Sequence, residues 1–162
     1  MFIQIIGGIA FIFLFLSYFM KEKENILFFQ IISYLIFSIH YLMLGAFTGS
    51  LLEVGCSLGA LINQRKVLNR QVYVLLLCLL YIMIGIISFD GWYSIIPTIT
   101  VILTTLGLAY GNTKIIKLTG IAACIGWAMY SLFVKSYVSV YTNIFLIIFI
   151  VMSMILRGKN EG

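Results

Sequence analysis

The sequence predicts an all-α integral membrane protein with seven transmembrane helices. The first observation is composition: 63% of the 162 residues are hydrophobic and only 9% are charged, too few polar side chains to cover a soluble domain of this size. The second is that the apolar residues form seven long runs. The third is that the basic residues between these runs are distributed in a way that predicts an orientation in the bilayer.

Each predicted span follows from the length of an apolar run, because a helix needs about 20 residues to cross the hydrocarbon core. The runs are continuously apolar, which favours helices over the short alternating strands of a transmembrane barrel. Together they form a single membrane domain, residues 1–162. The predicted spans are residues 2–20, 26–47, 48–64, 71–89, 92–110, 115–134 and 137–156.

Sequence features mark the limits of these spans in order. The first ends at the charges of KEKEN and lacks the basic start and cleavage site of a signal peptide, so we expect it to be retained. The second and third meet in a very tight turn, and the third is short and contains Glu53. The fourth follows a basic segment, and the fifth begins at Trp92 and Tyr93, which are typical interfacial anchors. The sixth and seventh are separated by a short loop with one lysine, Lys135.

The basic residues predict an extracellular N-terminus and a cytoplasmic C-terminus. Nine of the ten lie in loops on one side of the predicted membrane, and Lys135 alone lies on the other. Basic residues that flank spans are retained in the cytoplasm. Anchoring at the lipid surface accounts for these charges, so we expect no nucleic-acid partner. The nine residues are Lys21, Lys23, Arg65, Lys66, Arg70, Lys114, Lys117, Arg157 and Lys159.

An internal repeat is predicted from the odd number of spans. An offset of 89 residues places Tyr41 over Tyr130 and Gly8 over Pro97. Two parallel three-helix units, residues 1–66 and 92–162, would then be joined by a linker helix in residues 67–91, a 3+1+3 design found among transporters.

Glu53 and His40 are the main candidates for a functional site. At 1.5 Å per residue they lie roughly 8 and 12 Å from the outer boundary on adjacent helices. An ionisable group inside a membrane usually faces a partner or a wet cavity. One alternative is that Glu53 faces a partner or a wet cavity of this kind. The other is that Glu53 lies near enough to the interface to be hydrated, or is protonated and hydrogen-bonded to a neighbouring helix. His40 either joins helices by a hydrogen bond or contacts a solute or a proton.

Other residues are candidates for a path through the protein. The repeat places Asn143 near Glu53 across the axis between the units, and Trp127 either stacks on a ring-shaped solute or packs in the core. Pro97 is the only proline and the hinge candidate. The full set of substrate-path candidates is His40, Glu53, Trp127, Asn143, Tyr41, Tyr130 and Gln30.

Signatures of catalysis and of metal binding are missing from the sequence. There is no HExxH, GxSxG or Walker motif, and one histidine with one nearby carboxylate supplies too few metal ligands. We therefore expect no enzyme activity, no metal and no cofactor.

The run HYLMLGAFTGSLLEVGCSLGALINQRK resembles the YgjV-type family of bacterial inner-membrane proteins. The preceding LSYFMKEKENILFFQ and Trp127 fit the same pattern, and residues 17–66 carry the specific part of the resemblance. It implies residence in the bacterial inner membrane and, through the wider group of SWEET, PQ-loop and PnuC-like carriers, a 3+1+3 arrangement. The Pro-Gln dipeptide of PQ-loop proteins is absent.

These observations lead to two hypotheses about function. The first is a carrier that moves an uncharged or weakly charged small molecule by alternating access, with a proton taken up by Glu53 or His40. The second is a membrane protein that transports nothing and binds a lipid or a protein partner. In either case the helices contact the lipid bilayer, and a homo-oligomer is left open.

Overall fold

The computed structural model describes residues 2–17, 19, 20, 22–65 and 69–158, so Lys21, Lys66 and Lys159 lie outside the described residues. Within these ranges the chain forms seven α-helices and one 3₁₀ turn, and no strand. This confirms the prediction of an all-α chain. The elements are α1 (Phe2–Ser17), α2 (Lys23–Met43), α3 (Phe47–Arg65), α4 (Arg70–Ile87), η1 (Trp92–Ser94), α5 (Ile95–Tyr110), α6 (Thr113–Phe133) and α7 (Tyr137–Gly158).

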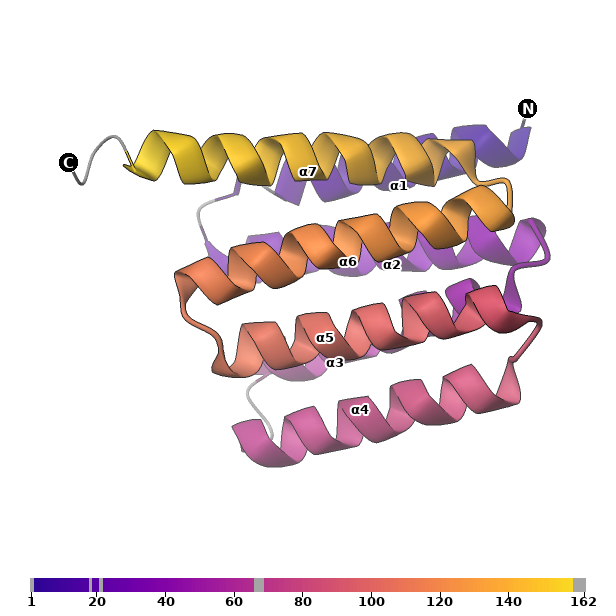
Figure 1. Ribbon diagram of the computed structural model, residues 1–162, viewed down its shortest axis with the longest axis horizontal. Helices are drawn as coiled ribbons and strands as arrows, with labels where there is room; N and C mark the ends of the chain where they lie inside the picture. The colour runs from indigo at the N-terminus through magenta and orange to yellow at the C-terminus, as the bar shows by residue number, and fades with distance from the viewer. Residues whose placement is uncertain (1, 18, 21, 66–68, 159–162) are drawn as a thin grey trace.

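Five of the described helices are long and apolar enough to cross a membrane: α2, α4, α5 together with η1, α6 and α7. Helix α1 and the apolar part of α3, Phe47–Ile62, are shorter. A helix of 16 residues, the length of α1, is still about 24 Å long at 1.5 Å per residue. Both shorter helices lie alongside the long ones in the same bundle (Figure 1).

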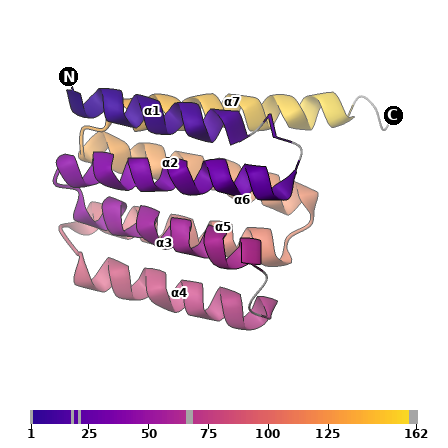
Figure 2. The same ribbon diagram turned by 180° about the vertical axis from the view of Figure 1, so that it is seen from behind.

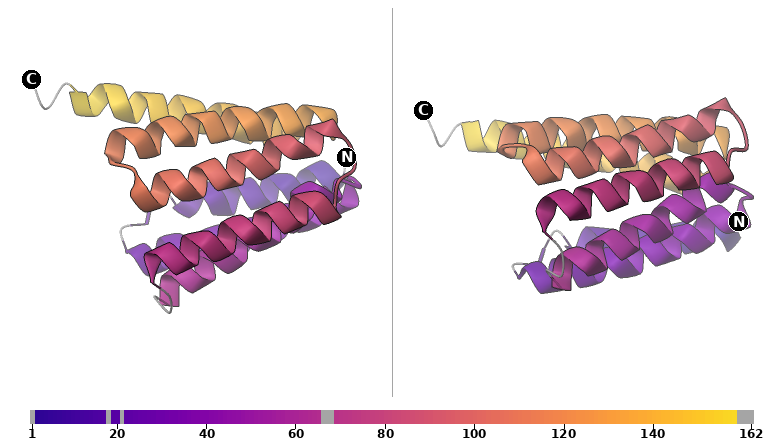
Figure 3. Two further views of the ribbon diagram at one scale, coloured as in Figure 1. Left: turned by 60° about the horizontal axis from the view of Figure 1, so that its bottom comes forward. Right: turned by 90° about the horizontal axis from the view of Figure 1, so that it is seen from below.

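The helices form two facing rows. One row contains α1, α2 and α3, and the other contains α7, α6 and α5 (Figures 1 and 2). Helix α1 contacts α7, and α3 contacts α5, so the rows meet along their outer helices. Helix α4 contacts α3 and α5 and covers one edge, as the views in Figure 3 show. Each row therefore holds three helices that are consecutive in the chain.

The outer faces of the bundle are apolar. On α4, for example, the side chains of Ile86 and Ile87 are 70% and 76% exposed. Apolar surface on this scale is unfavourable in water but matches the hydrocarbon core of a bilayer. The helices therefore contact lipid.

Two turns at the same end of the bundle share one backbone pattern. In the α2–α3 turn the Ala46 amide donates to the Tyr41 carbonyl at 2.9 Å, and in the α6–α7 turn the Ser136 amide donates to the Ser131 carbonyl at 2.8 Å. The two bonds are 90 residues apart in the chain, one more than the expected offset of 89.

Each turn places one residue in the left-handed conformation, Gly45 at φ 75° and Lys135 at φ 58°. We expect Gly45→Ala to lower the free energy of unfolding by about 1 kcal/mol, because a side chain disfavours this conformation. No atom lies within 4 Å of a Cβ added to Gly45, so the effect is one of backbone conformation alone. Lys135→Gly should raise stability by a similar amount. Denaturant titration of the purified protein in detergent tests both variants. A more stable Gly45→Ala variant or a less stable Lys135→Gly variant would contradict the turn geometry.

Gly49 allows α3 to lie against Tyr130 of α6. Its N–H is in the first turn of α3, where no helical partner exists, and it donates to the Tyr130 hydroxyl at 2.9 Å. A Cβ on Gly49 would lie 2.7 Å from Cε1 of Tyr130, whose side chain is fully buried. The close approach of α3 and α6 therefore depends on glycine here.

We expect Gly49→Ala to lower the free energy of unfolding by about 1–2 kcal/mol, the usual effect of overpacking. Gly8→Ala is the matched control, because no atom lies within 4 Å of a Cβ added to Gly8. Denaturant titration measures both variants. Adding Tyr130→Ala to Gly49→Ala removes the ring that clashes, so the double variant should lose less stability than the sum of the two single losses. Equal stability of the Gly49 and Gly8 variants would rule out this contact.

Candidate functional site

A cavity of about 560 Å³ lies between the two helix rows. Its lining on α2 extends from Leu27 to Tyr41, and on α3 from Glu53 to Ile62. The cavity also reaches Arg70 and Leu108, which are exposed. It therefore opens at the end of the bundle where α3 ends and α4 begins, and it stops near the middle of the bundle.

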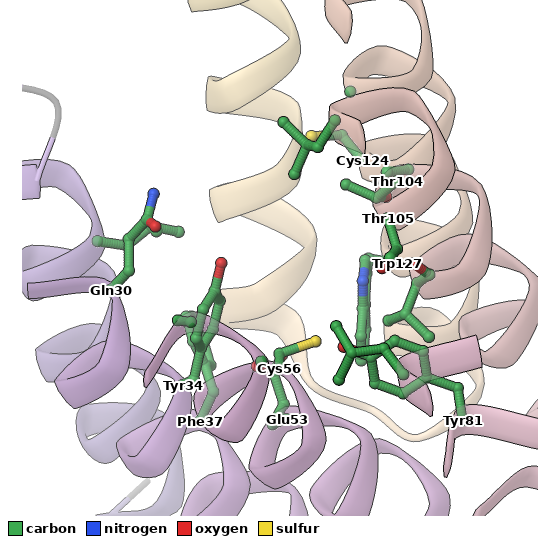
Figure 4. Close-up of a pocket in the computed structure, with 18 of the residues that line it drawn as sticks. Gln30, Tyr34, Phe37, Glu53, Cys56, Tyr81, Thr104, Thr105, Cys124 and Trp127 are labelled. Carbon is green, nitrogen blue, oxygen red and sulfur yellow. Dashed lines mark hydrogen bonds between the residues drawn. The ribbon is translucent and has the colours of Figure 1, made fainter. Parts of the chain in front are cut away.

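Five of the seven predicted path residues line this cavity, and they come from four helices. Tyr41 and Gln30 belong to α2, Glu53 to α3, Trp127 to α6 and Asn143 to α7. Figure 4 shows Glu53 of α3 and Trp127 of α6 on opposite sides of the cavity, with Gln30 further along α2. The other two candidates, His40 and Tyr130, are not in the lining.

Glu53 is almost completely enclosed, with 7% of its surface exposed, and it lies on the cavity wall. Among the described residues, none forms a hydrogen bond or an ion pair with its carboxylate. Cys56, one helical turn further along α3, lies beside it (Figure 4). A buried carboxylate without a protein partner is suited to bind a cation or to take up a proton.

The threonine hydroxyls of the described wall donate to the backbone. Thr104 and Thr105 donate to the carbonyls of Thr100 and Val101, both at 2.8 Å. Thr142 donates to the Val138 carbonyl at 2.9 Å. This is the usual behaviour of hydroxyl side chains in membrane helices. Asn143 uses one N–H in the same way, towards the Ser139 carbonyl at 2.7 Å.

Aromatic rings form the inner limit of the cavity. Tyr41 and Trp127 are stacked, with ring centres 5.7 Å apart and an interplanar angle of 27°. Tyr130 meets Trp127 edge to face at 6.0 Å. Trp127 therefore packs on neighbouring rings and also faces the cavity, while its stacking on a solute stays a prediction.

Beyond these rings the two rows are joined by hydrogen bonds, and we call this region the closed end. The Tyr41 and Ser131 hydroxyls are 3.0 Å apart, the Gly49 amide donates to Tyr130, and His40 Nε2 lies 2.6 Å from the Ser136 hydroxyl. Each of these bonds joins α2 or α3 of one row to α6 or the α6–α7 turn of the other. The closed end thus separates the cavity from the other end of the bundle.

His40 is fully buried and has a partner at each ring nitrogen. Nδ1 donates to the Ile3 carbonyl of α1 at 2.8 Å, and Nε2 bonds to Ser136. The side chain therefore links α1, α2 and the start of α7. His40 and Glu53 lie on adjacent helices, but His40 belongs to the closed end, whereas Glu53 faces the cavity.

Pro97 is fully buried in the first turn of α5, directly after η1. A proline is tolerated at this position because the first N–H groups of a helix have no partner within it. The helix continues through Pro97 without interruption. Its role as a hinge stays a prediction.

Gln4 is a residue of the closed end that the sequence did not single out. Its amide donates to the Lys135 carbonyl and accepts from the Val138 amide, both at 3.1 Å. The sequence did contain a signal for this role, because a polar residue such as Gln4 within an apolar span is stable only with a hydrogen-bonding partner. Its partners, however, lie more than a hundred residues away and are visible only in the fold.

The described residues contain no group of three or more His, Cys, Asp or Glu side chains that could hold a metal ion.

The apolar helices, the lipid-facing surface and the enclosed cavity define a multi-pass helical membrane protein. The family model Imp-YgjV, described as bacterial inner membrane protein, matches residues 1–160. The chain therefore belongs to this family and resides in the bacterial inner membrane, which confirms the resemblance seen in the sequence. A search of the curated proteins and a search of the solved structures gave no match.

Proposed function

We propose that this protein is a carrier that moves a small molecule across the inner membrane by alternating access of two three-helix units. The observation that carries the proposal is a cavity that touches Glu53, Trp127 and Asn143 and is open at one end. At the other end the rows are joined by hydrogen bonds. A site with access from one side only is what one state of such a carrier requires.

The arrangement of the rows supports the 3+1+3 repeat. A half turn about an axis between α2 and α6 relates α1 to α5, α2 to α6 and α3 to α7, and the members of each pair run in the same direction (Figure 1). The turn pattern that recurs after 90 residues agrees with this relation. Helix α4 then returns the chain across the membrane between the two units. That this 3+1+3 arrangement is like that of SWEET-type carriers is part of the proposal.

The charges support an orientation for the open end. Arg70 begins α4, and Lys114 and Lys117 lie in the first turns of α6, at the end of the bundle where the cavity opens. Lys135 lies at the opposite end, in the α6–α7 turn. By the positive-inside rule the cavity then faces the cytoplasm, and the structure corresponds to an inward-open state.

The reverse state requires the closed end to separate. Its bonds between side chains inside the membrane are each worth about 0.6 kcal/mol on average. A few bonds of this strength hold the rows together but allow them to part at ambient temperature. The carrier would then cycle by rocking one unit against the other around Glu53 and Trp127.

Transport by the reconstituted protein tests the proposal. Proteoliposomes should accumulate or release at least one small solute from a broad panel of uncharged and weakly charged molecules, with empty liposomes as the control. A pH-sensitive dye inside the vesicles reports any coupled proton flux. If no solute and no protons move, while labelled lipid or a purified partner binds to the protein, the non-transporting alternative replaces the carrier.

A further inference from the structure

We propose that the cavity beside Glu53 binds a monovalent organic cation with an apolar or aromatic body. The proposal rests on the carrier function for the claim that such a cation is transported, but the binding site itself is argued from the wall of the cavity. The three features that carry it are the charge of the wall, its free hydrogen-bonding groups and its rings.

The wall presents one negative charge in its interior. Glu53 is the only acidic residue among the described lining residues, and it has no protein partner there. Arg70 is the only basic residue among the described lining residues; it lies at the mouth, where its guanidinium carbon is 5.4 Å from the centre of the Tyr110 ring. A carboxylate that faces a largely apolar cavity without a counter-ion favours a positively charged ligand.

Several hydroxyl groups of the described wall use their hydrogens within the protein. The hydroxyls of Thr104, Thr105 and Thr142 donate to backbone carbonyls, as does one N–H of Asn143. The Tyr73 hydroxyl donates to the Gly59 carbonyl at 3.0 Å. The lone pairs of Thr104 and Thr142 and the Glu53 carboxylate remain for a ligand, and the amide N–H groups of Gln30 and Asn143 are the main donors left on the wall. A sugar needs donors as well as acceptors, whereas an ammonium group needs acceptors only.

The remaining surface suits an apolar ligand body. Rings from three helices, α2, α4 and α6, line the cavity, and a cation is attracted to the faces of such rings, most strongly to tryptophan. The volume of about 560 Å³ lies in the range of sites for drug-sized molecules. The aromatic lining residues are Tyr34, Phe37, Tyr41, Tyr73, Tyr81 and Trp127.

Binding of matched ions tests the charge preference. Tetraphenylphosphonium and tetraphenylborate have nearly the same size and shape but opposite charge, and 2-phenylethylammonium, whose N–H groups can donate hydrogen bonds, forms a smaller pair with its neutral analogue propylbenzene. We expect purified wild-type protein in detergent to bind at least one of the two cations, measured by equilibrium dialysis, and at least tenfold more tightly than its matched analogue. Micelles without protein give the background partition of each compound.

Two variants locate the site. Glu53→Gln should weaken binding of the cation at least tenfold. Glu24→Gln, the same chemical change on the exposed first turn of α2, should leave it unchanged. Because the comparison of cation with analogue uses the wild-type protein, it stands even if a variant fails to fold. Cation binding that survives Glu53→Gln, or no preference for either cation over its analogue, overturns the proposal.

The outcomes separate this inference from the carrier function. If a cation binds through Glu53 but is not moved across proteoliposomes by the wild-type protein, the ligand class stands and the carrier function fails. If instead a neutral solute is transported and neither cation competes with it, the carrier function stands and this inference fails.

Discussion

Replacement of Glu53 by glutamine should reduce solute transport at least about tenfold and leave the protein folded. Glu53 is the one carboxylate among the described lining residues, and the proposed attraction of a cation or uptake of a proton requires it. Hydrogen bonds to charged groups contribute about 1.5–3 kcal/mol, which corresponds to a tenfold to hundredfold effect. Glutamine has nearly the same shape, and Glu53 has no bonded partner among the described residues, so the substitution breaks no helix contact.

Flux into proteoliposomes at equal protein density measures this effect, and denaturant titration measures folding. Glu24→Gln controls for the loss of one negative charge outside the cavity. Normal transport by the Glu53 variant would mean that the carboxylate has no part in the cycle. A large loss of stability without a specific loss of flux would make Glu53 a structural residue.

The second large effect is expected at His40. His40→Ala should lower the free energy of unfolding by about 2–4 kcal/mol, because it leaves a cavity and removes both hydrogen bonds of a fully buried ring. The Ile3 carbonyl and the Ser136 hydroxyl would each lose a partner. Denaturant titration in detergent measures the change.

Ser136→Ala is the matched comparison, because it removes the partner of Nε2 and leaves the bond from Nδ1 intact. Its expected effect is about 1 kcal/mol. If His40→Ala instead kept normal stability but abolished transport, the histidine would act on a solute or a proton, which is the other role that the sequence allows.

Local properties of the chain determined the helices. The length of an apolar run depends only on consecutive residues, and all seven predicted spans correspond to helices. The largest error in a boundary lies at the end of α2, which was expected to reach residue 47 but ends at Met43. Hydropathy does not mark this turn, because Leu44, Ala46 and Phe47 are all apolar. Gly45, which adopts the left-handed conformation, was the more reliable signal.

Most of the predicted path residues that line the cavity could be picked out in the sequence because polar groups are rare inside a membrane. Glu53, Asn143, Gln30 and Trp127 stood out in apolar spans, and they do line one cavity. The closed end was harder to predict, because it consists of small or common residues such as Ser131 and Ser136. Nothing in their immediate sequence shows that the first bonds to Tyr41 and the second to His40.

The sequence by itself therefore determined that this is a helical membrane protein and where its helices lie, and it predicts how deep each polar residue is placed. Depth follows from the rise per residue along a helix. The direction in which a side chain points also depends on how each helix is rotated against its neighbours, and only the packing of the two rows decides that. This is why His40 and Glu53, at similar depths on adjacent helices, have different surroundings: one joins the rows, and the other faces the cavity between them.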